Sequence, residues 1–424
     1  MPHATKSSLT SHLSVPLALG DLSMRNRNVM ASLTRNRSVP TNVPNDLNLE
    51  YYVQRAKGGC GLILSEGALV VQQGSEYPHA PGIWNEEQAR AWQKITDAVH
   101  EHGALMFCQL WHLGRVAHPD MPEQKAAGKP VPGPSAIKAS GGKFRDLPGQ
   151  PGHVVPTPVE DPWTIVEEFK NAAKMAQKAG FDGVELHSAN GYLIHQFLDH
   201  TSNQRTDMWG GSIENRCRLG LECLKVLIEV WGPARVGIKV NPGAGCNDVG
   251  MPFPDTVRTF MHYLTQVSAM KPAYVQLVRY LRKMDVPVEG MDGVFRGVPH
   301  DVLRIYGPII KPHPSALEEH DEATYRGPAM PGPEFDSKNL TPTRLFVNGD
   351  LTPEEADKLV AEGIVDAAVF GVPWIGNPDL QKRIERGVPL NRDIDPTTFY
   401  TVPEGKDLSF GYTTYPEAKG QLPN

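Results

Sequence analysis

The sequence predicts a single-domain (β/α)8 barrel over residues 1–424, a closed ring of eight parallel strands inside a ring of helices. Three observations lead to this prediction. Eight short apolar segments alternate with longer segments of helical periodicity. The apolar segments lack the strict alternation of strands that face water, so both of their faces should be buried. Polar side chains cluster just after several of these segments, where the sites of α/β barrels lie.

The eight expected strands are short and mostly apolar. In chain order they are Asn28–Leu33, Gly61–Ser65, Ala104–Leu110, Asp182–His187, Val236–Val240, Tyr274–Val278, Arg344–Asn348 and Asp366–Phe370. Strands that each lead into a helix build parallel sheets, because the helix carries the chain back to the start of the next strand. A set of eight favours a closed barrel over an open, doubly wound sheet.

Helical segments lie between these strands. The segment Asn85–His102 repeats its apolar residues at helical spacing, and Gly103 follows it as a stop signal. Asp161 is the expected N-cap of a later helix that ends before Gly180. The full set is Leu47–Lys57, Asn85–His102, Asp161–Ala179, Ser212–Trp231, Pro254–Met270, Pro353–Glu362 and Asn377–Arg386.

Composition and charge exclude several classes of protein. The net charge of -6 gives no electrostatic reason to expect nucleic acid or an anionic membrane as a partner. No run of about 18 apolar residues could span a bilayer. The five cysteines are odd in number and none forms a C-x-x-C pair, so they indicate free thiols in a reducing compartment. We expect a cytoplasmic protein without a metal site, and the oligomeric state is left open.

Two long insertions interrupt the alternation of strands and helices. Residues 117–160 follow the third strand and are rich in proline, glycine and lysine, whereas residues 279–342 follow the sixth strand and are rich in proline. Loops of this length inside a compact domain are usually functional or disordered. Because both leave the C-terminal end of a strand, we expect both to cover the mouth of the barrel.

Polar residues at the ends of the fourth and fifth strands form the strongest candidate site. His187 ends the fourth strand, Asn190 and Tyr192 follow it, and Lys239 lies in the fifth strand. A helical turn after the strand would put His187 and Asn190 on one side, where both can donate to one carbonyl oxygen. Tyr192 can supply a proton. An isolated histidine is more often a core residue, but the surrounding pattern favours a site.

Two carboxylates at strand ends allow a rival interpretation. Glu66 ends the second strand, and Glu185 shares a strand face with His187. Paired carboxylates would suit a glycosidase. That function leaves the histidine, asparagine and tyrosine without a role, so we interpret Glu185 as an interior residue paired inside the barrel, with Lys239 as the expected partner.

Long motifs in the chain resemble those of the old yellow enzymes, a family of flavin-dependent ene-reductases. The stretch Asp182–Arg216 contains His-x-x-Asn-Gly-Tyr, then QFLD, and then the pattern NxRxDxxGGSxENR. The segment Met30–Arg35, MASLTR, is similar to the family's MAPLTR, and the segments CQLWH, IWNEEQ and GNPDL also match. The resemblance covers most of the chain and is thinnest in the second insertion.

The resemblance implies an FMN site at the mouth of the barrel. Its residues would be Ala31, Ser32, Leu33, Thr34, Gly67, Gln109, His187, Lys239, Gly349, Asp350, Gly371 and Val372. Thr34 and Gln109 would bond the flavin ring, and the cation of Lys239 would stabilise the anionic reduced ring. The loops that contain Gly349 and Gly371 would hold the phosphate.

Three positions depart from the family's pattern. Ser32 replaces a proline in the first-strand motif. Val372 stands where the family has an arginine, and Asp350 stands where the family has an uncharged residue. The loss of a bidentate cation and the gain of an anion should both weaken phosphate binding.

The resemblance also implies a reaction in which NAD(P)H reduces FMN and FMN reduces the C=C bond of an α,β-unsaturated carbonyl compound. His187, Asn190, Tyr192, Trp111 and Tyr400 would bind this substrate, with Tyr192 as the acid. A flavin-free isomerase or cyclase that uses Tyr192 as its acid, and a non-catalytic binding protein, are the two alternatives. The long insertions indicate a specialised substrate, as in secondary metabolism.

Overall fold

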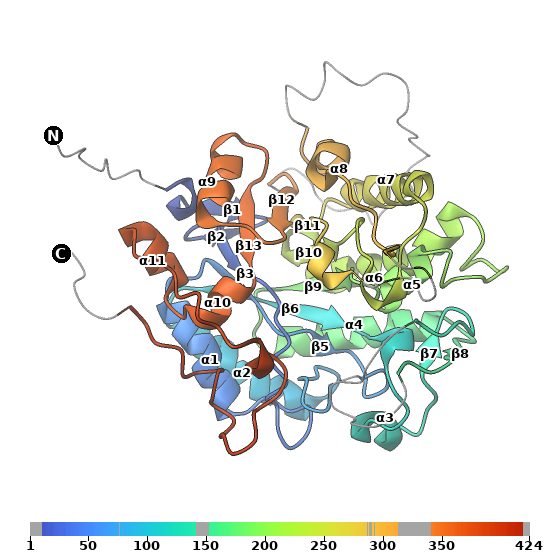
Figure 1. The fold of residues 1–424 in the computed structure, drawn as a ribbon, viewed down its shortest axis with the longest axis horizontal. Coiled ribbons are helices and arrows are strands. Elements are labelled where there is room, and N and C mark those ends of the chain that lie inside the picture. The colour runs from blue at the N-terminus through green and yellow to red at the C-terminus, as the bar shows by residue number, and fades with distance from the viewer. Residues whose placement is uncertain are drawn as a thin grey trace.

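Eight parallel strands close into a barrel in the computed structural model, which describes residues 11–75, 77–140, 152–285, 287, 291, 293–312 and 341–418 (Figure 1). The barrel strands are β3 (Asn28–Met30), β4 (Leu62–Leu64), β6 (Leu105–Trp111), β9 (Gly183–Ser188), β10 (Val236–Val240), β11 (Tyr274–Val278), β12 (Arg344–Asn348) and β13 (Ala367–Phe370). Their order is β4, β3, β13, β12, β11, β10, β9 and β6, and the pairing of β4 with β6 closes the ring. The predicted fold class and all eight predicted strands are confirmed.

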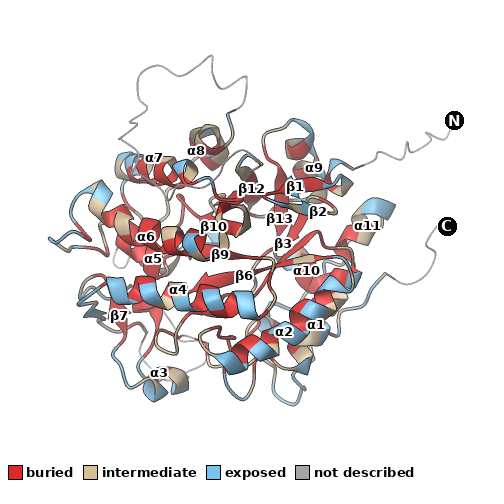
Figure 2. Cartoon of the chain, turned by 180° about the vertical axis from the view of Figure 1, so that it is seen from behind, coloured by how far each residue is buried: buried red, intermediate tan, exposed pale blue. Residues whose placement is uncertain are grey.

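A ring of helices covers the outside of the barrel, with buried inner faces and exposed outer faces (Figure 2). The longer helices are α1 (Asp46–Lys57), α2 (Glu86–His100), α4 (Trp163–Lys178), α6 (Ile213–Trp231), α7 (Phe253–Ala269), α8 (Val302–Ile310), α9 (Pro353–Ala361) and α11 (Leu380–Arg386). The N-cap of α4 is Pro162 rather than the predicted Asp161, which still accepts a hydrogen bond from the Trp163 backbone N–H at 3.1 Å. No helix among the described residues is both long and apolar enough to cross a membrane.

The sequence analysis missed several elements. Helix α8 lies inside the second insertion, where Gly307 and Pro308 interrupt its helical pattern. Strands β1 (Leu17–Leu19) and β2 (Leu22–Met24) form an antiparallel hairpin that shares one apolar cluster with residues inside the barrel. This hairpin therefore packs onto the barrel core. The other short elements are α3 (Pro122–Ala126), α5 (Leu193–Leu198), α10 (Val372–Gly376), β5 (Ala68–Leu69), β7 (Pro132–Gly133) and β8 (Thr157–Pro158).

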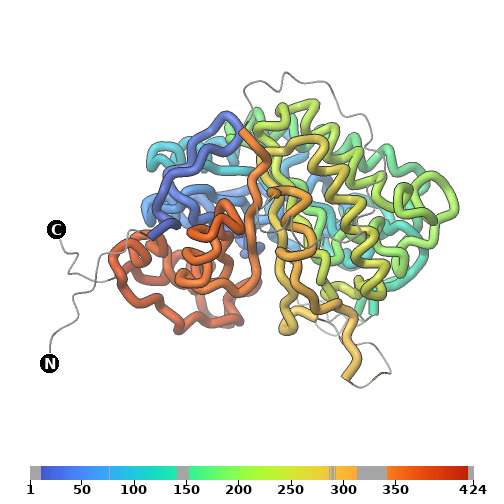
Figure 3. Tube along the Cα trace, turned by 90° about the horizontal axis from the view of Figure 1, so that it is seen from above, coloured from blue at the N-terminus to red at the C-terminus, as the bar shows by residue number. Residues whose placement is uncertain are grey.

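The beginning and the end of the described chain lie side by side. Strand β3 pairs in parallel with β13, so that Met30 lies opposite Phe370. Figure 3 shows the same neighbourhood along the whole trace, where the blue N-terminal part adjoins the orange and red C-terminal part. The loops that follow the first and the last barrel strand therefore meet at the same end of the barrel.

The interior of the barrel combines packed aromatic rings with one buried carboxylate. Tyr274 stacks on Phe346 with ring centroids 4.4 Å apart, and its hydroxyl donates to Glu185 Oε2 at 2.9 Å. Gly237 lies between Glu185 and Tyr274 in the strand register. A β-carbon at Gly237 would lie 2.1 Å from the Tyr274 ring. Because Gly237 has no side chain, the phenol can cross strand β10 and reach Glu185.

A Gly237→Ala variant should lose about 1–3 kcal/mol of unfolding free energy, because the added methyl group must displace the Tyr274 ring. Gly307→Ala is the matched control. Its β-carbon would meet Leu345 Cδ2 at an ordinary 3.4 Å, and alanine is favoured over glycine inside a helix by about 0.5–1 kcal/mol. Urea unfolding of both variants measures the difference. Equal stability of the two variants would contradict the role given to Gly237.

Candidate active site

A cavity of about 560 Å³ at the C-terminal ends of the barrel strands contains most of the predicted site residues. Those that line it are Ala31, Ser32, Leu33, Thr34, Gln109, Trp111, His187, Asn190, Tyr192, Lys239, Gly349, Asp350, Gly371, Val372 and Tyr400. A larger cavity of about 910 Å³ lies between α8 and α9 and contains only Gly349 and Asp350 from this set. The smaller cavity is the candidate site, because the predicted chemistry converges there.

Gly67 is the predicted residue that does not line the cavity. A β-carbon at Gly67 would lie 2.6 Å from Cε3 of Trp111, so the glycine makes room for the indole. Trp111 does line the cavity, and its ring contacts His187 and Tyr192. The two residues therefore have different roles: Trp111 lines the cavity, and Gly67 affects it only by leaving room for the Trp111 ring.

The turn after β9 brings His187, Asn190 and Tyr192 together. The sequence predicted a helical turn here, and the structure differs: Asn190 and Gly191 both have positive φ, of 56° and 73°. Asparagine and glycine tolerate this conformation, and a β-carbon at Gly191 would lie only 2.5 Å from the Cys246 carbonyl oxygen. Tyr192 then begins the short helix α5 as its N-cap. The Asn-Gly pair therefore reverses the chain and returns Tyr192 to the ring of His187, with centroids 5.0 Å apart.

His187 is a neutral hydrogen-bond donor in this environment. Burial, followed by the nearby charge of Lys239, holds the pKa of His187 well below its usual value. The Ala189 backbone N–H donates to His187 Nδ1 at 3.4 Å, which assigns the ring proton to Nε2. The Nε2–H group is therefore the part of the ring that can donate to a ligand in the cavity.

The amide of Asn190 is oriented by a residue that the sequence analysis missed. Asn241 directly follows β10, and its Nδ2 donates to Asn190 Oδ1 at 2.8 Å. With its oxygen engaged, Asn190 has its own Nδ2–H group available as a donor. Asn241 could have been found as a polar residue at a strand end, by the reasoning that selected His187 and Lys239.

A chain of hydrogen bonds runs from the cavity into the barrel. Ser32 Oγ donates to Gln109 Oε1 at 2.7 Å, and Gln109 Nε2 donates to Glu185 Oε1 at 2.6 Å. Tyr274 completes the set around Glu185, and burial raises the pKa of this carboxyl group. The predicted pairing of Glu185 with Lys239 is only electrostatic: the charge of Lys239 opposes this rise in the pKa of Glu185, but the hydrogen-bond partners of the carboxylate are Gln109 and Tyr274.

The glycosidase interpretation is not supported by the position of its carboxylates. Glu66 Oε2 accepts hydrogen bonds from the backbone N–H groups of Arg35 at 2.6 Å and Asn36 at 3.1 Å. Neither Glu66 nor Glu185 lines the cavity. Both carboxylates hold the barrel and its first loop together, and neither can flank a ligand in the cavity.

The ammonium group of Lys239 is the most unusual charge in the site. Lys239 is 7% exposed, lines the cavity, and makes no hydrogen bond or ion pair with any residue in the described part of the chain. Burial lowers the pKa of Lys239, and the charge of Glu185 opposes this shift. In the adjacent strand Gln276 is fully buried, and neither atom of its amide has a hydrogen-bond partner among the described residues. An anionic ligand such as the pyrimidine edge of reduced flavin would give the Lys239 ammonium a partner in the cavity.

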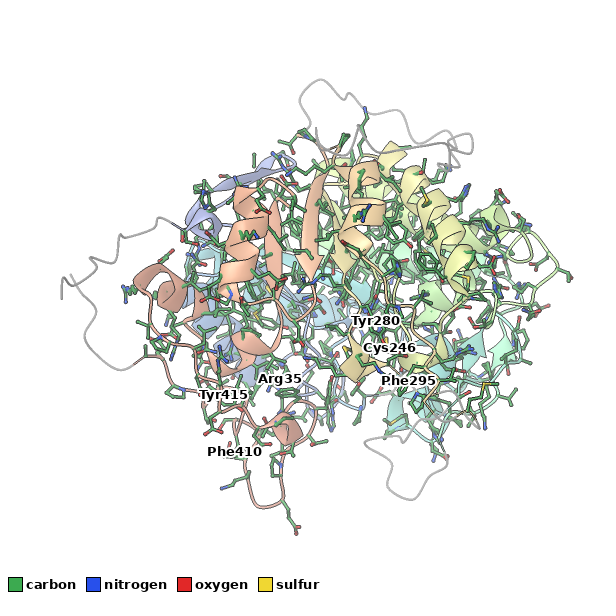
Figure 4. The ribbon with its side chains drawn as sticks, turned by 45° about the horizontal axis from the view of Figure 1, so that its top comes forward. Arg35, Cys246, Tyr280, Phe295, Phe410 and Tyr415 are labelled. Atoms are coloured by element: carbon green, nitrogen blue, oxygen red, sulfur yellow. The ribbon has the colours of Figure 1, made fainter. Side chains whose placement is uncertain are left out.

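The loop after β3 attaches the C-terminal segment to the mouth of the barrel. Arg35 donates to the carbonyl oxygens of Phe399 at 3.1 Å and Gly411 at 2.6 Å, and Asn36 Nδ2 donates to the Tyr400 carbonyl at 3.0 Å. Figure 4 shows Arg35 beside the segment that carries Phe410 and Tyr415. Tyr400 is thereby held at the cavity, 5.4 Å from the ring of Tyr77.

The two insertions contribute unequally. Leu281, Lys283 and Met284 of the second insertion line the cavity, whereas no described residue of 117–160 does. The expectation that both cover the mouth is confirmed only for the second among the described residues. Tyr77 and Phe399 also line the cavity and were missed. They lie in irregular segments without periodicity, so the sequence held no signal for them.

The comparisons with known proteins agree with this geometry. The model of the NADH:flavin oxidoreductase / NADH oxidase family matches residues 12–283. Flavin oxidoreductase hxnT of Emericella nidulans is 35% identical over 418 residues, with 96% of this chain and 98% of that protein covered. A probable flavin mononucleotide-dependent alkene reductase of Leishmania infantum is 34% identical over 407 residues, with 95% and 96% covered. The structure of the old yellow enzyme homologue from Zymomonas mobilis superposes with a TM-score of 0.76 at 32% identity, with 96% and 99% covered.

The matches to the relatives and to the solved structure extend over nearly the whole chain, and the structural match agrees with the barrel. The chain therefore belongs to the NADH:flavin oxidoreductase family, the old yellow enzymes, which are FMN-dependent oxidoreductases that use NAD(P)H.

Proposed function

We propose that the 560 Å³ cavity is the active site in which this enzyme reduces the C=C bond of an α,β-unsaturated carbonyl compound. The observation that carries the proposal is the convergence of His187, Asn190, Tyr192 and Lys239 on one cavity. Two neutral donors and a phenol suit a carbonyl substrate, and an unpaired ammonium suits an anionic cofactor. The insertion residues Leu281 and Met284 would add apolar contacts that restrict which substrate fits.

FMN would lie between the loops after β3 and β13, with NAD(P)H as the reductant. Ala31, Ser32, Leu33 and Thr34 would line its ring, and Gln109 and Lys239 would face its pyrimidine edge. The bound flavin would supply the redox chemistry by taking a hydride from NAD(P)H and delivering it to the β-carbon of the substrate. The protein's part is to bind, orient and polarise.

His187 and Asn190 would bind the carbonyl oxygen of the substrate. As the β-carbon is reduced, negative charge builds on this oxygen, and two convergent N–H donors stabilise it. The His187 Nε2–H and the Asn190 Nδ2–H are both fixed before the reaction, by Ala189 and Asn241 respectively. Because these donors need no reorganisation, their effect on the barrier is larger than that of mobile groups.

Tyr192 would protonate the α-carbon. Its ring lies edge-on to both Trp111 and His187, with centroid distances of 4.9 and 5.0 Å, which fixes the plane from which its hydroxyl acts. A phenol remains protonated at neutral pH and is therefore ready as an acid. Trp111 and Tyr400 would enclose the substrate and exclude water.

The alternatives use fewer of the observed features. A flavin-free isomerase or cyclase would need the oxygen donors and Tyr192 but would leave Lys239 without an anion. A non-catalytic binding protein would give no specific role to the oxygen donors, to Tyr192 or to Lys239. An absorption spectrum of the purified protein decides the point: a flavin band, with FMN identified after release, supports the reductase, and a colourless protein that gains no flavin from added FMN would overturn it.

The His187→Ala variant should bind phenols and enones more weakly by about 1–3 kcal/mol, because one of two convergent donors is lost. Since the pKa of His187 lies well below its usual value, its contribution should not vary between about pH 6 and pH 8. Asn241→Ala should have a smaller effect, because it only releases the amide of Asn190. Ligand titrations followed by flavin absorbance measure all three proteins, and unchanged affinity in His187→Ala would contradict the assignment.

The Tyr192→Phe variant should slow reoxidation of the flavin by an enone and leave its reduction by NAD(P)H unchanged. Only the reaction with the enone needs an acid at the α-carbon. Stopped-flow absorbance separates the two half-reactions. If both slow equally, Tyr192 positions a ligand and does not act as the acid.

A further inference from the structure

Among the described residues that line the active-site cavity, only two are lysine or arginine: Lys239 and Lys283. Lys239 lies opposite His187 in the register of β9 and β10, next to the oxygen-binding donors. Lys283 lies beside the loop after β12, which contains Gly349 and Asp350. The place where the family has arginine holds Val372, which offers no side-chain donor.

Lys283 and Asp350 form a direct ion pair. Lys283 Nζ contacts Asp350 Oδ1 at 2.5 Å and Oδ2 at 2.6 Å. The two side chains are 59% and 61% exposed, so the pair is solvated and contributes little to stability. An ammonium held this weakly can exchange part of its contact with Asp350 for a contact with a phosphate.

The loop that carries Lys283 is fixed against the loop after β12. Arg279 donates from Nη2 to the Gly349 carbonyl oxygen at 2.7 Å and from Nη1 to Glu355 Oε1 at 2.5 Å. Gly349 has a φ of 129°, and a β-carbon there would lie 3.0 Å from Arg279 Cβ. The guanidinium of Arg279 thus joins the two loops and does not line the active-site cavity, whereas Lys283 of the same loop does.

We propose that Lys283 binds the terminal phosphate of FMN in place of an arginine at position 372, and that Asp350 holds the Lys283 ammonium in position for it. This inference rests on the proposed function. It resolves the charge conflict at this end of the cavity, because Asp350 alone would repel a phosphate that carries up to two negative charges, and its pair with Lys283 is neutral. Asp350 is then a positioning residue for Lys283.

Titration of apoprotein with FMN and with riboflavin tests the proposal, because riboflavin has the same ring and no phosphate. Lys283→Met should weaken FMN binding by about 10- to 100-fold, as expected for a lost charge-assisted hydrogen bond, and leave riboflavin binding unchanged. Lys57→Met is the matched control, since Lys57 is an exposed lysine in the last turn of α1 and lines neither cavity. The effect of Lys283→Met should shrink at high salt, which screens exposed charges.

Two further variants test the positions of the charges. Val372→Arg in the Lys283→Met background should restore FMN affinity, because it returns a cation to the other phosphate loop. Asp350→Asn should change FMN affinity little in the wild type, because it removes a carboxylate that repels the phosphate and also the contact that positions Lys283, and these two effects oppose each other. In the Lys283→Met background only the repulsion is removed, so the same substitution should raise FMN affinity several-fold.

The outcomes separate this proposal from the proposed function. If wild type binds FMN no more tightly than riboflavin, or if Lys283→Met lowers the affinity for both equally, Lys283 does not hold the phosphate, while the reductase function stands. If wild type binds neither compound, the proposed function itself fails and this inference fails with it.

Discussion

The buried ammonium group of Lys239 makes no direct ion pair with any described residue, and much of the site can be understood from that fact. A buried charge without a partner is costly, and burial lowers the pKa of Lys239 as expected. The charge of Glu185 favours the ammonium without a direct ion pair, because the two oxygens of this carboxylate accept hydrogen bonds from Gln109 and Tyr274. A reduced flavin whose pyrimidine edge carries negative charge would form an ion pair with Lys239. The cofactor would then balance the buried charge of the ammonium and also supply the redox chemistry.

The interior of the barrel is arranged to keep that position open. Because Gly237 has no side chain, Tyr274 can cross β10 and donate a hydrogen bond to one oxygen of Glu185, while Gln109 donates to the other oxygen. Gln109 is held in turn by Ser32, the residue that replaces the family's proline. With serine at this position, the backbone of the first loop still lines the cavity, and the Ser32 hydroxyl also fixes the side-chain amide of Gln109. The departure from the family's motif therefore adds a contact to the site.

The sequence predicted the barrel and many of the residues that line its cavity, because both depend on regular strands. Parallel strands bring their C-terminal ends to one mouth, so a polar residue at a strand end, such as His187 or Lys239, could be assigned to the site from position alone. The predictions failed where irregular backbone decides the outcome. Asn190 reaches the cavity through a left-handed turn, helix α8 contains Pro308, which interrupts its sequence pattern, and Lys283 lies in an insertion without periodicity. The sequence alone could not place Lys283 beside Asp350, because two loops distant in sequence meet only in the folded chain.

The midpoint potential of bound FMN in wild type and in a Lys239→Gln variant tests the central claim most directly. Glutamine keeps a hydrogen-bond donor of similar reach but removes the charge, so oxidised flavin should still bind. If Lys239 stabilises the anionic reduced flavin, the variant should have a lower potential than wild type, and reduced FMN should lose more affinity than oxidised FMN. Equal potentials in the two proteins would show that the buried ammonium does not act on the flavin, and would contradict the account given for the site.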